Sequence, residues 1–132
     1  MGVNFRKSIE GAADLRTEPV EIPAWPHVDD DGQPVLNEDG TPNCTYYVRM
    51  MNLGERQSFD MAVAVKRGDT YEMNPQRVRA ELLVRTLCDD KGVRLFHASE
   101  IAGLEGKGGE PCSAAFTASQ KLNGLVGADV KN

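Results

Sequence analysis

The chain has few cysteines, few aromatic residues and no long apolar run. Its three cysteines, Cys44, Cys88 and Cys112, are widely spaced among 132 residues, a pattern that supports neither a disulfide framework nor a paired zinc site. The mean hydropathy is −0.43, and no segment approaches the roughly 20 consecutive apolar residues of a membrane-spanning helix. The N-terminal residues also lack the apolar core of a secretory signal. We therefore expect one soluble domain with reduced cysteines, which remains in the compartment where it is made.

Short signatures of catalysis are also missing. The chain contains no phosphate-binding loop, no dinucleotide fingerprint and no pair of histidines at helical spacing. Asp89 and Asp90 lie in a polar segment and are expected to be solvated, whereas acid–base catalysis needs a desolvated carboxylate. Counted from Asp29, Pro34 and Gly40 stand where a calcium-binding loop requires glycine and glutamate. We expect no catalytic residues, cofactor, metal or small-molecule substrate.

The negative charge is concentrated at the start of the chain. Residues 1–42 contain three basic and nine acidic side chains, whereas residues 43–132 contain 12 basic and 11 acidic ones. Affinity for nucleic acid comes largely from Lys and Arg that displace counterions from phosphates. The acidic N-terminal segment, residues 1–42, therefore argues against a nucleic-acid partner.

Two segments have the pattern of strands. Apolar and acidic residues alternate at 20–22, where flanking prolines restrict the segment to a short edge strand. The best strand is 43–51, in which one face carries Cys44, Tyr46, Val48 and Met50. Between the two, Asp-Gly pairs at 31–32 and 39–40 predict two tight turns.

The rest of the chain is predicted to be helical. Asn52 and Glu55 have the spacing of a capping box, so a helix should begin there and end near Arg67 and Gly68. A second helix should begin at Asn74 and Pro75, with its apolar stripe at Val78, Leu82, Leu83 and Leu87 and with Arg77, Arg79, Glu81 and Arg85 elsewhere on its surface.

A polar turn at 89–92 is expected to follow and to return Leu95 and Phe96 to the core. A short helix should then direct Ile101 and Leu104 inward. A last helix should run from near Pro111 to the Asn-Gly pair at 123–124. The predicted fold class is α+β, with short N-terminal antiparallel strands followed by a half of three to four helices. We expect a flexible N-terminal arm at 1–13, a single domain at 14–125 and a C-terminal tail at 126–132.

A protein without reactive groups can act by covering the exposed apolar surface of another protein. Such a surface needs large apolar side chains that the protein's own core does not fully cover. The candidate contact residues are Trp25, Tyr47, Met51, Leu53, Phe59 and Phe116. Burial in the core is the competing interpretation for each of them.

Six short pieces of the sequence follow one another in an order that can be compared with known families. They are Trp25 in a short N-terminal strand, Tyr47-Val48-Arg49 before a polar helix start, Glu55-Arg56-Gln57-Ser58-Phe59, the run from Arg79 to Asp89, Gly92-Val93-Arg94-Leu95-Phe96, and Leu122-Asn123-Gly124-Leu125. In this order they resemble the small tail assembly chaperones of long-tailed bacteriophages. The chain differs from that family's pattern in its longer 26–43 segment and in its glycine-rich 106–111 segment.

The resemblance implies a noncatalytic protein of the host bacterial cytoplasm. Such a protein would bind the tape-measure protein, keep its hydrophobic helices soluble and bring tail-tube subunits to it. The resemblance also implies self-association. The alternative is a structural tail or head–tail joining component that stays in the virion, and mass spectrometry of purified virions would distinguish the two.

Overall fold

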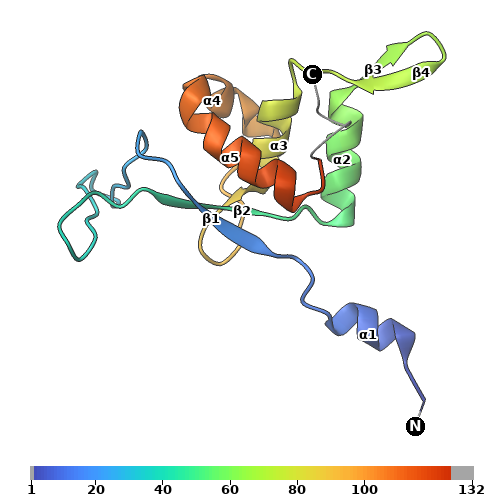
Figure 1. Cartoon of the computed structure of the whole chain (residues 1–132), viewed down its shortest axis with the longest axis horizontal. Coiled ribbons are helices and arrows are strands. Elements are labelled where there is room, and N and C mark those ends of the chain that lie inside the picture. The colour runs from blue at the N-terminus through green and yellow to red at the C-terminus, as the bar shows by residue number, and fades with distance from the viewer. Residues whose placement is uncertain (1, 126–132) are drawn as a thin grey trace.

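The computed structural model describes residues 2–125 and shows a small sheet covered on one face by helices (Figure 1). Strands β1 (Thr17–Glu21), β2 (Thr45–Arg49) and β5 (Leu87–Cys88) form an antiparallel sheet with β2 in the centre. The other elements are α1 (Phe5–Gly11), α2 (Leu53–Val63), β3 (Ala64–Arg67), β4 (Thr70–Met73), α3 (Val78–Thr86), the 3-10 turn η1 (Ala98–Glu100), α4 (Ile101–Glu105) and α5 (Gly109–Leu122). This is the predicted α+β class, with N-terminal strands and a mainly helical C-terminal half.

The two predicted strands pair with each other. Val20 of β1 lies opposite Tyr46 of β2, and Thr17 lies opposite Arg49. β1 is an edge strand, as the flanking prolines indicated, because the missing N–H of Pro19 leaves a gap in any ladder.

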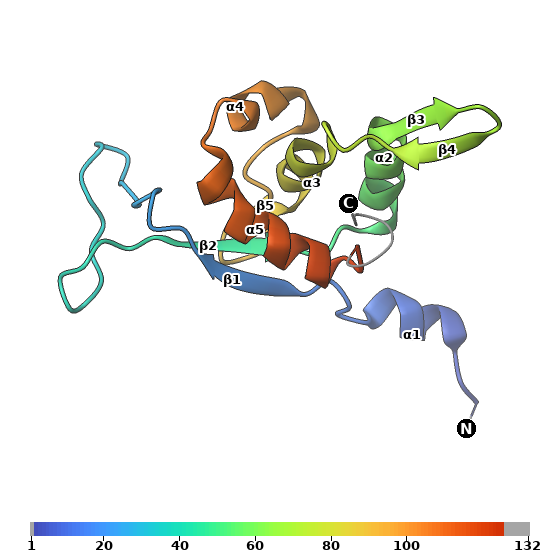
Figure 2. The same ribbon diagram turned by 45° about the horizontal axis from the view of Figure 1, so that its top comes forward.

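Two apolar clusters make up the core. The first joins the sheet to α3, α4 and α5 and contains Ile22, Val48, Leu83, Val84, Leu87, Leu104, Cys112, Ala115 and Leu122. The second joins α2, α3 and α5 and contains Met51, Phe59, Val63, Val78, Leu82, Phe116 and Leu125. α3 contributes to both clusters, and Figure 2 shows it between α2 and α4. Every residue from Glu81 to Cys88 is consequently buried.

The predicted start of the helix at Asn52 is correct, but its predicted end near Arg67 and Gly68 is wrong. Asn52 accepts a hydrogen bond from the Glu55 amide at 2.8 Å, and the Glu55 carboxylate accepts one from the Asn52 amide at 3.0 Å. The helix then stops at Val63 instead of Arg67, and β3 and β4 form a protruding hairpin (Figure 1). Gly68, with φ of +64°, forms the turn, a conformation that favours glycine.

The predicted boundary and polar surface of α3 also need correction. The chain at 74–77 forms a turn, because Asn74 accepts hydrogen bonds from the Gln76 and Arg77 amides, and the helix begins only at Val78. The apolar stripe is buried as predicted. Glu81 and Arg85, however, are buried with it, because neighbouring elements enclose α3 and the two charges pair with each other.

Besides the β3–β4 hairpin, two further segments project from the body (Figures 1 and 2). The 26–43 arm contains the two predicted turns, with Gly32 and Gly40 at φ of +79° and +84°. At the other end of β1, residues 5–11 form helix α1, which the sequence pattern did not predict. The domain boundaries at 13 and 125 remain predictions, and the proposed tail at 126–132 lies outside the described residues.

The predicted elements after β5 are present, but only Phe96 packs against the core, whereas Leu95 is 45% exposed. Gly92, with φ of +82°, closes the polar turn, and Asp89 accepts hydrogen bonds from the Lys91 and Val93 amides. Leu104 of α4 is buried, and α5 ends at Leu122, just before the Asn-Gly pair. Within residues 2–125, no helix has the length and apolar character needed to cross a membrane.

Candidate interaction site

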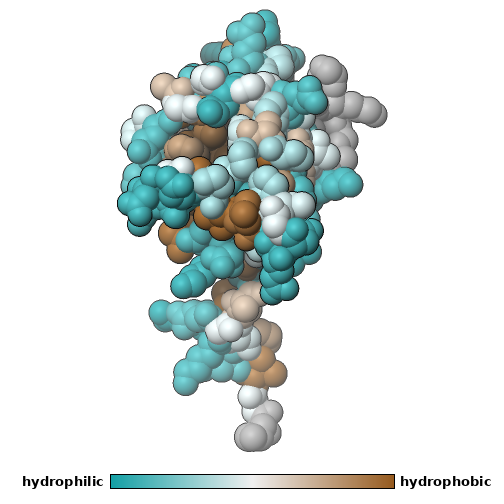
Figure 3. All heavy atoms as spheres, turned by 90° about the vertical axis from the view of Figure 1, so that its left-hand side faces the viewer, coloured by the Kyte–Doolittle hydropathy of each residue, from teal (hydrophilic) through white to brown (hydrophobic). Residues whose placement is uncertain are grey.

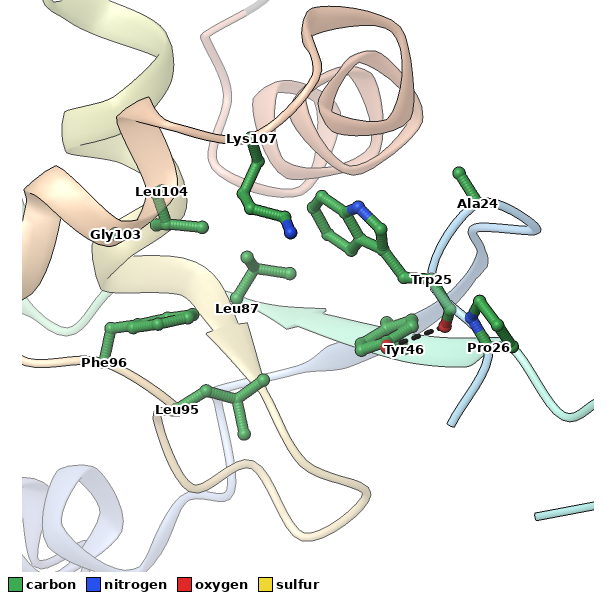
Figure 4. Close-up of a pocket in the computed structure, with 10 residues that line it drawn as sticks. All are labelled: Ala24, Trp25, Pro26, Tyr46, Leu87, Leu95, Phe96, Gly103, Leu104 and Lys107. Carbon is green, nitrogen blue, oxygen red and sulfur yellow. Dashed lines mark hydrogen bonds between the residues drawn. The ribbon is translucent and has the colours of Figure 1, made fainter. Parts of the chain in front are cut away.

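An apolar groove opens where the end of the sheet meets α4. It has a volume of about 470 Å³, and we call it the Trp25 groove (Figure 4). Its lining comes from five parts of the chain and consists of Ala24, Trp25, Pro26, Tyr46, Leu87, Leu95, Phe96, Gly103, Leu104 and Lys107. Only Lys107 among these residues carries a formal charge, so the groove suits an apolar side chain.

One wall of the groove is fixed by Trp25 and Tyr46. The Trp25 amide donates to the Ile22 carbonyl at 2.9 Å, which turns the chain after β1. The Tyr46 hydroxyl donates to the Trp25 carbonyl at 2.8 Å, and the two rings meet edge to face with centroids 5.7 Å apart. Burial raises the pKa of Tyr46, so the hydroxyl keeps its proton at neutral pH and can serve as this donor. His27 stacks on the Tyr46 ring at 4.3 Å.

The opposite wall belongs to the segment after the 89–92 turn. Arg94 donates to the Glu55 carboxylate at 3.1 Å and to the Val84 carbonyl at 3.1 Å. Arg49 of β2 donates to the same Glu55 carboxylate. This charge cluster ties the segment to α2, α3 and β2, and thereby positions Leu95 and Phe96 against the groove.

Lys107 lies in the connection between α4 and α5. Its amide donates to the Leu104 carbonyl at 3.0 Å, which fixes the backbone at the end of α4. In Figure 4 its side chain extends into the groove, and the amine lies near the Trp25 ring. The amine forms no ion pair with a described residue. It can therefore pair with an acidic group of a bound chain.

The structure places three of the six candidate contact residues in the core. Phe59 is completely buried, and Met51 and Phe116 are each 7% exposed. All three belong to the second apolar cluster, and the guanidinium of Arg79 also lies 4.4 Å above the Phe116 ring. These three residues are thus enclosed by their own chain and offer no surface to a partner in this conformation, because helices α2, α3 and α5 pack against one another there.

The other three candidates do not form one surface. Trp25 is half-buried and lines the groove. Tyr47 is also half-buried, but it pairs with Cys88 of β5 and points to the opposite face of the sheet from Tyr46. Leu53 is 75% exposed in the first turn of α2. Of the six, only Trp25 belongs to the groove.

Sequence reasoning missed most of the groove. Phe96 and Leu104 were expected to face the core, Tyr46 was placed only on one face of its strand, and Lys107 was not singled out at all. The pattern did indicate correctly that Leu104 faces inward. It carried no signal that Phe96 and Tyr46 stop short of full burial, because this depends on how α4 is placed relative to the sheet.

The three cysteine thiols are unreactive at neutral pH in this fold. All three cysteines are free. Burial raises the pKa of Cys88 to about 11, and burial is also the main cause that raises the pKa of Cys44 and Cys112. Because the thiolate is the reactive form, these cysteines are poor nucleophiles at neutral pH. Residues 2–125 contain no cluster of three or more His, Cys, Asp or Glu side chains that could hold a metal ion.

A comparison with solved structures identifies the fold. The structure of the bacteriophage HK97 tail assembly chaperone matches with a TM-score of 0.51, over 89% of this chain and 96% of that one, at 16% sequence identity. The chain has the fold of the HK97 tail assembly chaperone. No protein-family model matches the sequence, and no curated protein matches it significantly. The match to HK97 therefore supports the predicted resemblance at the level of structure.

Proposed function

We propose that this chain is a noncatalytic bacteriophage tail assembly chaperone, which binds the tape-measure protein of its phage, keeps it soluble and promotes assembly of the tail tube. The observation that supports this best is the shared fold with the HK97 chaperone, which extends over nearly the whole of both chains. A shielding role also suits a chain in which burial raises the pKa of each thiol and two open grooves have mainly apolar linings.

We assign the client site to the Trp25 groove. An amphipathic helix binds to a groove by inserting apolar anchors spaced three or four residues apart. The Trp25, Tyr46, Phe96 and Leu104 side chains provide apolar walls for such an anchor. Lys107 would pair with an acidic residue beside the anchor or with the carboxyl-terminal end of the bound helix, where the helix dipole is negative.

The proposed function also specifies where the tape-measure protein is bound and which protein joins the complex next. Tape-measure protein would be bound in the cytoplasm of the host bacterium, before the tube forms around it. Tail-tube protein would then be brought to the complex. A chaperone leaves after assembly, whereas a structural tail or head–tail joining component would stay in the particle.

Gly103 provides a sharp test of the client site. It lines the Trp25 groove on α4, and a Cβ at this position meets no atom within 4 Å. Gly103→Gln should therefore obstruct the groove without straining the core. When the variant is co-expressed with the tape-measure protein, we expect the soluble fraction of that protein to fall several-fold relative to co-expression with the wild-type chain.

Ala102→Gln is the matched control. Ala102 is exposed on the same helix but does not line the groove, so this variant should solubilise the client as well as the wild type does. If the tape-measure protein precipitates equally with and without the wild-type chain, the chaperone function is wrong. If only the groove assignment is wrong, Gly103→Gln will behave like Ala102→Gln. Detection of the chain in purified virions would favour the structural role.

A further inference from the structure

Another pocket adjoins the Trp25 groove. It has a volume of about 500 Å³ and is lined by Arg49 of β2 together with residues 92–97. We call it the Arg49 pocket. Leu95 and Phe96 line both the pocket and the groove, so the two cavities share a wall. Figure 4 shows these two residues at the side of the groove away from Trp25.

The Arg49 pocket has a surplus of positive charge. Arg49 and Arg94 both donate to the Glu55 carboxylate, and their side chains are 15% and 26% exposed. Among residues 2–125, Glu55 is the only carboxylate in an ion pair with either arginine. No acidic side chain of the described chain lines the pocket. Two guanidinium charges thus share one carboxylate, which leaves one positive charge without a counterion.

The acidic residues of the adjacent turn do not neutralise this charge. One oxygen of Asp89 accepts hydrogen bonds from the Lys91 and Val93 amides at 2.8 and 3.0 Å. Neither Asp89 nor Asp90 forms an ion pair with a described residue. A partly buried charge without a counterion is costly in free energy, so an anion bound in the pocket is stabilised.

The two arginines also have more hydrogen-bond donors than the described chain accepts from. Each guanidinium carries five N–H groups. Arg94 donates to Glu55 and to the Val84 carbonyl, whereas Arg49 donates to Glu55 and, at 3.5 Å, to the Gly92 carbonyl. The Nε atoms of both are buried and have no acceptor among the described residues. The cluster is therefore short of acceptor oxygens as well as of negative charge.

These two deficits favour a carboxylate as the ligand. The parallel N–H groups of a guanidinium match the two oxygens of a planar carboxylate. One carboxylate also balances one positive charge, whereas a phosphoryl group carries nearly two negative charges at neutral pH. We propose that the Arg49 pocket binds a carboxylate, and that the chain in the Trp25 groove supplies it from an Asp or Glu side chain. The second part rests on the proposed function.

A chain bound in the groove is the nearest source of such a side chain. Residues three or four apart on a helix lie about 5–6 Å from each other, so one pair can place an apolar side chain in the groove and an acidic one across the wall of Leu95 and Phe96. Figure 3 views the side from which the 26–43 arm projects and shows apolar patches between hydrophilic atoms. Because the apolar patches are small, a charged contact beside the groove adds specificity.

NMR of the full, 15N-labelled chain tests the carboxylate site. The Nε atoms of Arg49 and Arg94 are buried, so their protons should exchange slowly enough to be observed. The probe is N-acetylglutamate N-methylamide at constant ionic strength, and N-acetylglutamine N-methylamide is the neutral control. We expect both Nε–H resonances to shift with the acid and to stay in place with the amide. Equal shifts, or none, overturn the site, and tighter binding of inorganic phosphate overturns its assignment to a carboxylate.

Val93→Glu supplies an internal carboxylate, and Val93→Gln is its neutral counterpart. Val93 lines the pocket and is 60% exposed, so either side chain fits. Compared with Val93→Gln, Val93→Glu should bind the acidic probe at least about tenfold more weakly and unfold at a higher urea concentration, because it neutralises the surplus charge. If the two variants bind the probe equally and unfold together, no uncompensated charge faces the pocket and the inference is wrong.

Co-expression with the tape-measure protein tests the source of the carboxylate. Val93→Glu should lower the soluble fraction of that protein relative to Val93→Gln, and equal solubility overturns the client as the source. Gly103→Gln, which obstructs only the Trp25 groove, should bind the acidic probe as the wild type does. If the wild-type chain does not solubilise the tape-measure protein, the proposed function and the client as source both fail, whereas the NMR titration decides the carboxylate site by itself.

Discussion

Arg85 donates two hydrogen bonds to Glu81, one turn earlier on α3, at 2.9 Å to the carbonyl and 2.7 Å to the carboxylate. The two side chains are only 5% and 7% exposed. Arg85 also donates to the Ser58 hydroxyl of α2 at 2.9 Å. Arg77 approaches the same Glu81 carboxylate from the surface, at 2.8 Å, with its own side chain 57% exposed. One carboxylate therefore has a buried partner and an exposed partner.

The first prediction compares these two partners. Glu81→Gln should lower the free energy of unfolding by about 3–5 kcal/mol, because it leaves the Arg85 charge buried without a counterion. Arg77→Ala should lower it by less than about 1 kcal/mol, because solvent screens an exposed pair. Urea denaturation measures both changes. Equal effects of the two substitutions would contradict the burial of the Glu81–Arg85 pair, and the double variant Glu81→Met/Arg85→Met should recover most of the lost stability.

The second prediction concerns the carboxylate shared by Arg49 and Arg94. Glu55→Gln keeps a side chain that can complete the capping box with Asn52, but it removes the charge that holds both arginines. We expect a loss of about 2 kcal/mol in unfolding free energy and faster amide hydrogen exchange in residues 89–97. Asn52→Ala is the control, since it should cost about 1 kcal/mol without changing exchange in that segment. Similar exchange patterns for both variants would show that Glu55 does not anchor the segment.

The third prediction concerns Asn123, which joins the end of α5 to the end of β2. Its side chain accepts a hydrogen bond from the Met51 amide at 2.7 Å and donates to the Arg49 and Ser119 carbonyls at 3.2 and 2.9 Å. Asn123→Ala should lower the free energy of unfolding by about 2–3 kcal/mol, because three hydrogen bonds are worth about 1 kcal/mol each. Chemical denaturation checks this. Lys121→Ala, at an exposed position on the same helix, should change stability by less than about 0.5 kcal/mol.

The fourth prediction concerns pH. Burial raises the pKa of Cys88 from 9.0 to about 11, so between these pH values the folded chain keeps a proton that the unfolded chain loses. Stability falls wherever the unfolded state binds fewer protons. The contribution of Cys88 is thus complete below pH 9 and decreases as the pH rises towards 11. Urea denaturation at several pH values should show that the stability difference between the wild type and Cys88→Ala shrinks across this window. A constant difference would mean that the thiol is not desolvated.

The local parts of the fold could be predicted because their signals lie within a few residues. The Asn52–Glu55 capping box needs only four consecutive residues, and Gly32, Gly40 and Gly92 adopt the positive φ that their turns require. The alternation in 43–51 likewise fixes which side chains share a face of β2. The expectation of a tail assembly chaperone fold came from the resemblance of the ordered sequence pieces to that family, and the structural match supports it.

The groove could not be predicted, because its walls come from distant segments. Trp25 and Phe96 are 71 positions apart in the sequence, and they meet only because β1 pairs with β2 while the Glu55 cluster holds the segment after β5. The same limitation placed Phe59 and Phe116 among the candidate contacts. A large apolar side chain has the same local pattern in a core as on a binding surface, and only packing distinguishes them.

By itself, the sequence determined the capped start of α2, the glycine turns, the edge position of β1 and the absence of local catalytic motifs, since each depends on backbone geometry or on neighbouring side chains. Tertiary structure decided which faces became enclosed. It converted the expected extension of α2 into a hairpin, buried Glu81 with Arg85, and left α1 outside the core. These outcomes depend on the free energy of burying surface between segments far apart in the chain, which no short pattern contains.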